Sequence, residues 1–419
     1  MRREVVIVGG GPGGAVAAMC LLREGLRPVI VEKEAFPRYH IGESMTGEAG
    51  NLLRRMGLED RMLQDRHPQK QGVRVFGGTG RNAWFVPVMG RAADGSLEDG
   101  HTWQVRRSGF DRMMLDEALA RGAELLPGRA VDVLRSGDDH RVHGVRVHMR
   151  DGGVQEVRSD LLIDASGQQT FLAHQGVASQ RRLGRYDRQI AVFSQVANTI
   201  RDAGPREMHG DNTLIFYASK FRWAWFIPLD DEVVSVGVVI PGAYFVERGE
   251  SRHDFLLREL RELHPELSRR LPDLTLLEEA RAIPNYSYHV SRFSGPGWLC
   301  IGDTHRFIDP IFSFGLYVSM REAELAAPIA AAWLGSEHRT HSDPFAAHAR
   351  RCEAGLDNLQ DLIDGFWEHP LGFAHLVNGQ RTKADLIDLF AGRIYMDAPS
   401  QGVRELQGLA RAVRETTPA

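Results

Sequence analysis

Three glycines near the start of the chain stand at a spacing that suits the binding of a diphosphate. Gly9, Gly11 and Gly14 form a G-x-G-x-x-G motif directly after the apolar run 5–8. The first glycine of such a motif allows a tight turn, the second lets the backbone approach the phosphates, and the third lets a helix pack closely on a strand. Glu32 ends a second apolar run, where an acid accepts hydrogen bonds from a ribose diol. The free amides at the start of the intervening helix favour an anion, so we predict a dinucleotide site.

Three later segments are expected to return to the same sheet, because one fingerprint does not hold a whole dinucleotide. Residues 103–119 contain an Arg-x-x-Phe-Asp motif within a helical pattern. Apolar strands at 161–163 and 298–301 each lead into small and acidic residues, and a helix is predicted from about residue 316. Small residues after a strand let the backbone pass close to a nucleotide, and helix amides favour an anion. The residues that these segments place at the dinucleotide are Arg107, Asp164, Gly167, Asp303 and Pro310.

The composition is typical of a globular enzyme. Of the 419 residues, 43% are hydrophobic and 25% charged, which predicts two domains or one large domain with insertions. A net charge of −4 gives no reason to expect nucleic acid or a membrane as a partner, and no apolar run is long enough for a membrane span. Three widely spaced cysteines argue against a disulfide framework or a metal site and favour a cytoplasmic location.

Two further motifs are more specific than a dinucleotide site. Trp223, Trp225 and Pro228 form a W-x-W-x-I-P motif, and Lys70 begins a K-x-G-x-x-F motif. The runs FPRYHIGES and FIDPIFSFG accompany them. With these motifs in this order, the chain resembles the flavin-dependent halogenases of the pyrrole and phenol branch, which share the FAD fold of aromatic hydroxylases. The resemblance covers nearly the whole chain.

The resemblance implies an α/β fold with a Rossmann-like FAD-binding domain, an antiparallel β-sheet substrate domain and a C-terminal helical segment. Alternating apolar and polar residues at 233–240 independently favour an antiparallel sheet. We expect the FAD-binding domain to comprise residues 1–67, 98–175 and 281–335, the substrate domain residues 68–97 and 176–280, and the C-terminal helical cap residues 336–419.

The implied reaction halogenates an electron-rich aromatic ring. FADH₂ from a separate flavin reductase and O₂ give a flavin hydroperoxide, and a chloride or bromide ion converts it into hypohalous acid. Lys70 then presents the halogen to a phenol, pyrrole or indole, free or tethered to a carrier protein. It acts either as an ammonium that hydrogen-bonds hypohalous acid or as an amine that forms a haloamine. Burial can lower the pKa of a lysine toward neutrality, which suits the second route.

The resemblance also implies roles for neighbouring residues. Trp223 and Trp225 form a barrier between the flavin and the substrate, and Ser313 and Gly315 bind the halide. Phe314 departs from the commoner Ser-Ser-Gly form, which leaves the choice between chloride and bromide open. Asn285 replaces an acid found in many relatives, so a covalent flavin is not expected there. Arg38 and Ser44, in the run FPRYHIGES, join the residues predicted to bind FAD.

Alternative interpretations stay open on the sequence alone. Lys70 can be a solvated lysine on a strand edge, and the tryptophans can be core residues on one face of a strand. His67 and His305 are interpreted as surface or hydrogen-bonding residues. The chain can also be an aromatic hydroxylase that reduces its own FAD with NAD(P)H, or a flavin reductase or inactive flavin-binding protein that has kept the fold.

Overall fold

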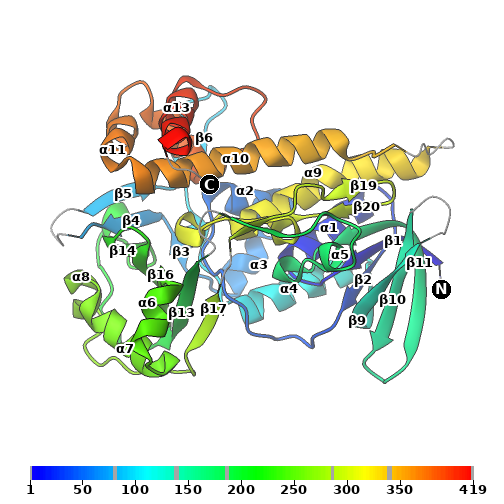
Figure 1. The fold of residues 1–419 in the computed structure, drawn as a ribbon, viewed down its shortest axis with the longest axis horizontal. Helices are drawn as coiled ribbons and strands as arrows, with labels where there is room; N and C mark the ends of the chain where they lie inside the picture. Colours follow the sequence, from blue (N-terminus) through cyan, green and yellow to red (C-terminus); the bar gives the residue numbers. More distant parts are fainter. Residues whose placement is uncertain are drawn as a thin grey trace.

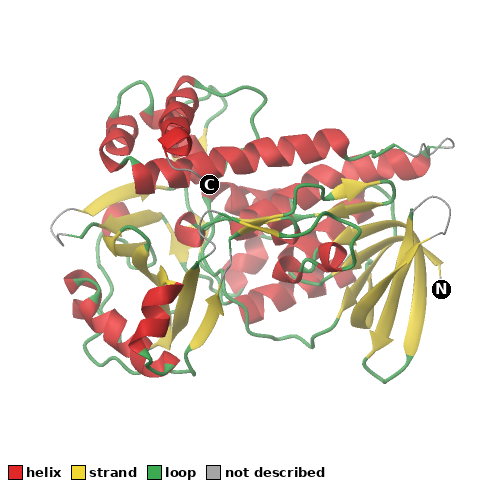
Figure 2. Ribbon diagram, viewed as in Figure 1, coloured by secondary structure: helices red, strands yellow, loops and turns green. Residues whose placement is uncertain are grey.

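The computed structural model describes residues 2–78, 83–135, 141–184, 188–284, 287–336 and 342–416. Two large sheets lie at opposite ends of the molecule, and long helices connect them (Figures 1 and 2). Asn285 lies outside the described residues. None of the helices in the described ranges has the length and apolar character needed to cross a bilayer.

The first sheet is built around parallel strands, as expected of a Rossmann-like domain. Its parallel core has the order β9-β2-β1-β11-β20, and β10 pairs antiparallel with β9 and β11. The helices α1 and α9 pack against each other, and α4 packs on α1. These elements are β1 (Arg2–Val8), α1 (Pro12–Arg23), β2 (Pro28–Glu32), α4 (Arg107–Ala120), β9 (Glu124–Arg135), β10 (Val142–Met149), β11 (Val154–Asp164), β19 (Ser294–Gly295), β20 (Trp298–Cys300) and α9 (Gly315–Gly335).

The second sheet has the order β17-β13-β16-β15-β14-β4-β5 and is antiparallel except where β14 pairs parallel with β4. On β15, Trp223 and Trp225 face the main core, whereas Ala224 and Phe226 face a second core under the helices α7 and α8. The elements are β4 (Gly72–Phe76), β5 (Ala83–Pro87), β13 (Gln189–Val196), β14 (Thr213–Ser219), β15 (Arg222–Pro228), β16 (Val234–Pro241), α6 (Gly242–Arg248), α7 (Arg252–Glu262), α8 (Pro265–Arg269) and β17 (Arg281–Pro284).

The C-terminal part is helical, as the spacing of its apolar residues predicts. The long helix α10 runs beside α9, and the later helices lie above β4 and β5 (Figure 1). These helices are α10 (Ala346–Glu368), α11 (Pro370–Asn378), α12 (Lys383–Ala391) and α13 (Gln401–Thr416). The predicted domain limits stay a prediction. The segment 281–335, predicted to belong to the FAD-binding domain, begins with β17, which pairs with β13 of the second sheet.

Short elements complete the described chain. Of these, β3 and β8 form a two-stranded ladder that carries Lys70. The short helices and strands are α2 (Gly47–Arg55), α3 (Glu59–Gln64), β3 (Gln69–Lys70), β6 (Met89–Arg91), β7 (Leu97–Asp99), β8 (Thr102–Trp103), α5 (Phe171–His174), β12 (Arg182–Leu183), β18 (Tyr288–His289) and β21 (Arg306–Phe307).

Candidate active site

A cavity of about 360 Å³ lies between the carboxyl ends of the first sheet and the inner face of the second. This is the position where ligands bind in open α/β sheets. The structure brings most of the predicted residues to it. Those that line it are Gly9, Gly11, Glu32, Arg38, Ser44, Arg107, Gly167, Trp223, Trp225, Asp303, Pro310, Ser313 and Gly315.

The glycine motif has the close contacts that its spacing predicts. Gly9 has a φ of +107°, and a Cβ there would lie 2.4 Å from the carbonyl oxygen of Ala165 at the end of β11. A Cβ on Gly14 would lie 2.0 Å from the carbonyl oxygen of Gly9. Gly11 precedes the first turn of α1, and a Cβ there would lie 3.4 Å from Nη2 of Arg38. A diphosphate at the start of α1 would therefore meet free amides and a guanidinium.

Acidic residues hold the polar groups around this end of the cavity. Glu32 accepts the amides of Gly10 and Glu34, each at 2.7 Å, and a carboxylate retains further acceptor capacity for a ribose. Asp111 is fully buried and binds Arg107 through two hydrogen bonds of 2.6 and 3.0 Å. Arg38 reaches the same carboxylate at 3.2 Å. One buried acid thus fixes two cations at the cavity.

Asp164 lies behind the cavity rather than on its surface. It is fully buried at the end of β11, and its two carboxylate oxygens accept the amides of Ser166 and Leu172 at 3.0 and 2.8 Å. Both bonds hold the turn that brings Gly167 to the cavity. Asp164 therefore fixes the shape of this turn, and its contact with FAD stays a prediction.

Lys70 lies in the protein interior and not on a solvated strand edge. Its side chain is 2% exposed, and Nζ donates to Ser44 Oγ and to the carbonyl oxygen of Met45, both at 2.9 Å. Burial lowers the pKa of Lys70 from its usual value to about 7. The amine is therefore available near neutral pH.

A second, much smaller cavity adjoins Lys70. It has a volume of about 20 Å³, and its lining includes Phe312 and, from α12, Phe390 and Ala391. Ser44 borders the larger cavity and Lys70 the smaller one, and the two side chains are hydrogen-bonded. Only the side chain of Ser44 thus separates the Lys70 amine from the large cavity.

Trp223 and Trp225 lie side by side on β15, with ring centroids 5.9 Å apart. Both line the large cavity and neither lines the small one. The indole nitrogen of Trp225 donates to Ser235 Oγ at 3.1 Å. Pro228, which ends the strand, lies outside both linings. The tryptophans form one side of the large cavity, and their role as a barrier stays a prediction.

The turn before α9 presents backbone to the large cavity. Ser313 has a φ of +62°, and its amide donates to the carbonyl oxygen of Pro310 at 3.0 Å. Gly315 begins α9, so the following amides lack acceptors within the helix. Phe314 is 4% exposed and also lines the cavity. This turn can supply donors to a halide, with the ring of Phe314 beside them.

The comparisons with known proteins agree with this geometry. Residues 2–353 match the family model described as an FAD binding domain. A 1H-pyrrole-2-carbonyl-[peptidyl-carrier protein] brominase of Pseudoalteromonas luteoviolacea is 35% identical, over 93% of this chain and 91% of that protein. The chain belongs to the flavin-dependent halogenases. It is thus an oxidoreductase that uses FAD and a halide ion.

Two further relatives support this family. A 1H-pyrrole-2-carbonyl-[peptidyl-carrier protein] chlorinase of Pseudomonas fluorescens is 25% identical to this halogenase, over 98% of this chain and 93% of that protein. The solved structure of the flavin-dependent brominase Bmp2 superposes with a TM-score of 0.91 at 33% identity, and both chains are fully covered. The expected fold class and family are confirmed.

Buried carboxylates that sequence reasoning missed also fit FAD in this halogenase. Glu43 Oε2 and Asp309 Oδ2 are buried at the large cavity and have no hydrogen-bond partner within the described chain. Burial raises the pKa of Glu43, of Asp303 and of Asp309 to about 7 in each case. Such atoms fit a cofactor that brings donors into the cavity. Glu43 stands in the run FPRYHIGES, which was the available signal for it.

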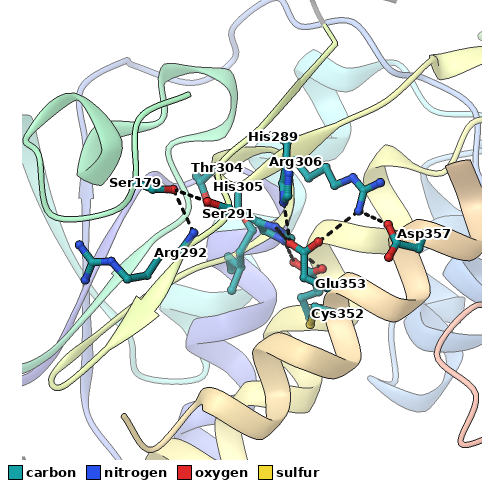
Figure 3. Close-up of polar contacts among 12 residues, drawn as sticks. Ser179, His289, Ser291, Arg292, Thr304, His305, Arg306, Cys352, Glu353 and Asp357 are labelled. Carbon is teal, nitrogen blue, oxygen red and sulfur yellow. Dashed lines mark hydrogen bonds and ion pairs between the residues drawn. The ribbon is translucent and has the colours of Figure 1, made fainter. Parts of the chain in front are cut away.

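His305 is a buried hydrogen-bonding residue and not a surface residue. Its ring stacks on Phe293 with centroids 3.9 Å apart, and Nε2 lies 2.9 Å from Glu322 of α9. Figure 3 shows Glu353 of α10 beside it, paired with His289 at 2.9 Å and with Arg306 at 3.2 Å. These contacts fasten α9 and α10 to the turn that carries Asp303. His67 is half-buried, with its ring edge-on to Phe110.

Proposed function

We propose that this halogenase receives reduced FAD from a separate flavin reductase and halogenates a pyrrole ring presented as a thioester on a carrier protein. The names of two relatives, a brominase and a chlorinase of such pyrroles, support this substrate class. The burial of Lys70 beside a separate small cavity carries the proposal. A cytoplasmic location stays a prediction from cysteine usage.

Residues of the large cavity would bind FAD and the halide, and Lys70 at the small cavity would receive the halogen. When bound, reduced FAD and O₂ supply hypohalous acid from the halide. Gly11 and Arg38 would hold the diphosphate, and Glu32 and Asp303 would accept the ribose and ribitol hydroxyls. The amides after Ser313 would hold the halide. The neutral Lys70 amine would take the halogen from hypohalous acid: the N–halogen bond forms as the O–halogen bond breaks, and the released hydroxide leaves as water with one amine proton. With a pKa of about 7, about half of the amine is uncharged near pH 7.

A pyrrole ring needs more room at Lys70 than the structure provides. A cavity of about 20 Å³ holds roughly one water molecule. Phe390 and Ala391 of α12 and Phe312 form its sides. We therefore infer that α12 shifts when the tethered ring enters. After this movement, a long carrier arm would bring the tethered ring to the buried amine.

The test measures products and flavin oxidation together. The purified protein, FAD, a flavin reductase and NADH are combined with bromide or chloride and with 1H-pyrrole-2-carbonyl carrier protein, and the released acyl group is weighed by mass spectrometry. Free pyrrole-2-carboxylate, a phenol and an indole serve as alternative substrates. We expect halogenated pyrrole only from the carrier-bound substrate and only when halide and O₂ are present.

Three results would contradict the proposal, the third in its substrate class alone. NADH oxidation by the protein without a reductase, stimulated by an aromatic substrate that gains oxygen, would identify an aromatic hydroxylase. Flavin oxidation that yields only hydrogen peroxide with every substrate and either halide would indicate an inactive flavin-binding protein. Halogenation of free phenol or indole in preference to the carrier-bound pyrrole would overturn the substrate class and leave the enzyme class intact.

A further inference from the structure

Two buried hydroxyl groups, on Ser44 and Thr213, join Lys70 to the flavin cavity. Lys70 Nζ lies 2.9 Å from Ser44 Oγ, which in turn lies 2.9 Å from Thr213 Oγ1. Ser44 and Thr213 both line the large cavity, whereas Lys70 lines the small one. The three side chains come from separate parts of the sequence and are almost completely buried. The hydroxyl pair is therefore a polar bridge between the two cavities.

Gln104 fixes the other end of this bridge. Its side-chain Nε2 lies 3.1 Å from the carbonyl oxygen of Asp211 and 2.8 Å from Thr213 Oγ1. A carbonyl oxygen can only accept, so the atom that faces it is the amide nitrogen, and this nitrogen also donates to Thr213. The backbones of Ser44 and Gln104 form an isolated β-bridge, which holds both ends of the bridge together.

The hydroxyl pair thus receives a hydrogen bond at both ends when Lys70 is an ammonium. Lys70 donates to Ser44, and Gln104 donates to Thr213. Each hydroxyl carries one proton, and the bond between them uses only one of the two. Whichever way that bond runs, one hydroxyl proton remains. Because both hydroxyls line the flavin cavity, this proton is available to an acceptor there.

We propose that Ser44 and Thr213 are positioning residues that hold the Lys70 amine and offer a hydroxyl proton to hypohalous acid arriving from the flavin cavity. The role rests on the proposed function of Lys70. The oxygen of hypohalous acid can accept this proton in a hydrogen bond, and it is then held within one residue of the amine. A neutral Lys70 keeps two N–H groups, so it can still donate to Ser44 and to the carbonyl oxygen of Met45 while its lone pair stays free. The remaining hydroxyl proton is therefore available in the form of Lys70 that captures the halogen.

Four variants separate this role from a general effect on packing. Ser44→Ala removes the side-chain acceptor of Lys70 and leaves the Met45 carbonyl. Thr213→Val removes the second hydroxyl at similar volume, and Thr213→Ser restores it. Thr102→Val is the matched control, because Thr102 is a buried residue opposite Lys70 in the β3–β8 ladder and its hydroxyl has no hydrogen-bond partner in the described chain. FAD affinity is measured for each variant, since Ser44 also borders the cofactor cavity.

The main measurement needs no turnover. The protein with oxidised FAD, carrying ¹³C at the lysine Cε positions, is followed by NMR across a pH series, and the Lys70 signal is assigned from its loss in Lys70→Ala. A hydrogen bond to a charged group stabilises the charge, so Ser44→Ala should lower the titration midpoint of this signal by about one pH unit. Thr213→Val should lower halogenated product per hydrogen peroxide about fivefold. Thr213→Ser and Thr102→Val should match the wild type in both measurements.

The outcomes distinguish this proposal from the proposed function. An unchanged midpoint in Ser44→Ala, or full product yield in Thr213→Val, would overturn the hydroxyl bridge even if Lys70→Ala loses halogenation. A Thr213→Ser variant as impaired as Thr213→Val would overturn it as well, because the hydroxyl would then not be the group that matters. Continued halogenation by Lys70→Ala would overturn both the proposed function of Lys70 and the role of the hydroxyl pair.

Discussion

At the scale of single residues, Lys70 differs from the other cations of the site. Arg107 and Arg38 share the carboxylate of Asp111, whereas Lys70 has two neutral acceptors, Ser44 and the carbonyl of Met45. Neutral acceptors offset the cost of burying a charge only partly, so the pKa of Lys70 falls to about 7. A fixed cation suits phosphate binding, and a lysine that loses its charge suits capture of an electrophile.

The pH dependence of halogenation should report this charge. The neutral amine is the capturing form, so halogenated product per hydrogen peroxide should rise as the pH passes through about 7. Lys70→Ala should lower product by about 100-fold or more and keep peroxide release. Both quantities are measured in one assay with reduced FAD supplied chemically. A flat pH profile would favour the alternative in which the ammonium only hydrogen-bonds hypohalous acid.

The pH dependence of protein stability gives a second measure of the pKa of Lys70. Its pKa in the folded protein, about 7, lies below the value near 10.4 expected when unfolded. The unfolded chain therefore binds one more proton between these limits. This residue makes the free energy of unfolding rise with pH across that window by about 1.4 kcal/mol per pH unit. Lys70→Met should remove the rise, so its advantage over wild type is largest below about pH 7. Urea unfolding at several pH values tests this.

An exposed position provides the control for the stability measurement. Lys383 is exposed at the first position of α12, so Lys383→Met should change the free energy of unfolding by a similar small amount at every pH. If Lys70→Met showed the same constant difference, Lys70 would not be buried as a titrating group.

At the scale of elements, the close packing of the Trp225 side chain of β15 on β16 depends on Gly237. Trp225 lies opposite Gly237, and a Cβ on Gly237 would lie 2.3 Å from the Trp225 ring. Gly237→Ala should therefore displace the ring, cost about 1–3 kcal/mol of unfolding free energy and weaken FAD binding. Gly109→Ala in α4, where a Cβ would have open space, should be neutral or stabilising. Chemical unfolding and flavin fluorescence titration measure both effects; normal FAD affinity in Gly237→Ala would show that the ring does not shape the cofactor site.

Elements defined by neighbouring residues could be predicted from the sequence. The β1–α1–β2 unit and the start of α9 follow from local glycine and apolar patterns, and the structure has them. The contacts of Lys70 could not be predicted, because Ser44 and Thr213 come from segments distant in sequence. Asp164 was predicted to contact the cofactor, but the pattern of a strand end does not show that backbone amides already occupy its carboxylate.

At the scale of the whole molecule, the C-terminal helices complete a site that begins at the N-terminus. Phe390 and Ala391 of α12 close the cavity at Lys70, and α10 is fastened by Glu353 to the turn after Asp303. Aromatic rings connect these parts, since Phe312 contacts Phe366 of α10 and Phe390 with centroids 5.4 and 5.0 Å apart. The sequence predicts helices here, but it does not show that they close the space beside one buried amine.

This closure predicts where the protein responds to its substrate. The cavity at Lys70 is too small for an aromatic ring, so we expect α12, which lines it, to shift when a tethered pyrrole reaches the amine. Hydrogen exchange followed by mass spectrometry should therefore change in residues 383–391 when pyrrole-loaded carrier protein is added with oxidised FAD, and unloaded carrier should produce less change. Exchange in β1 and α1, which lie in the core of the first sheet, should stay the same. If loaded carrier left α12 unchanged while halogenation proceeded, the ring would have to reach Lys70 by another path, and the large cavity beside Ser44 would be the place to look for it.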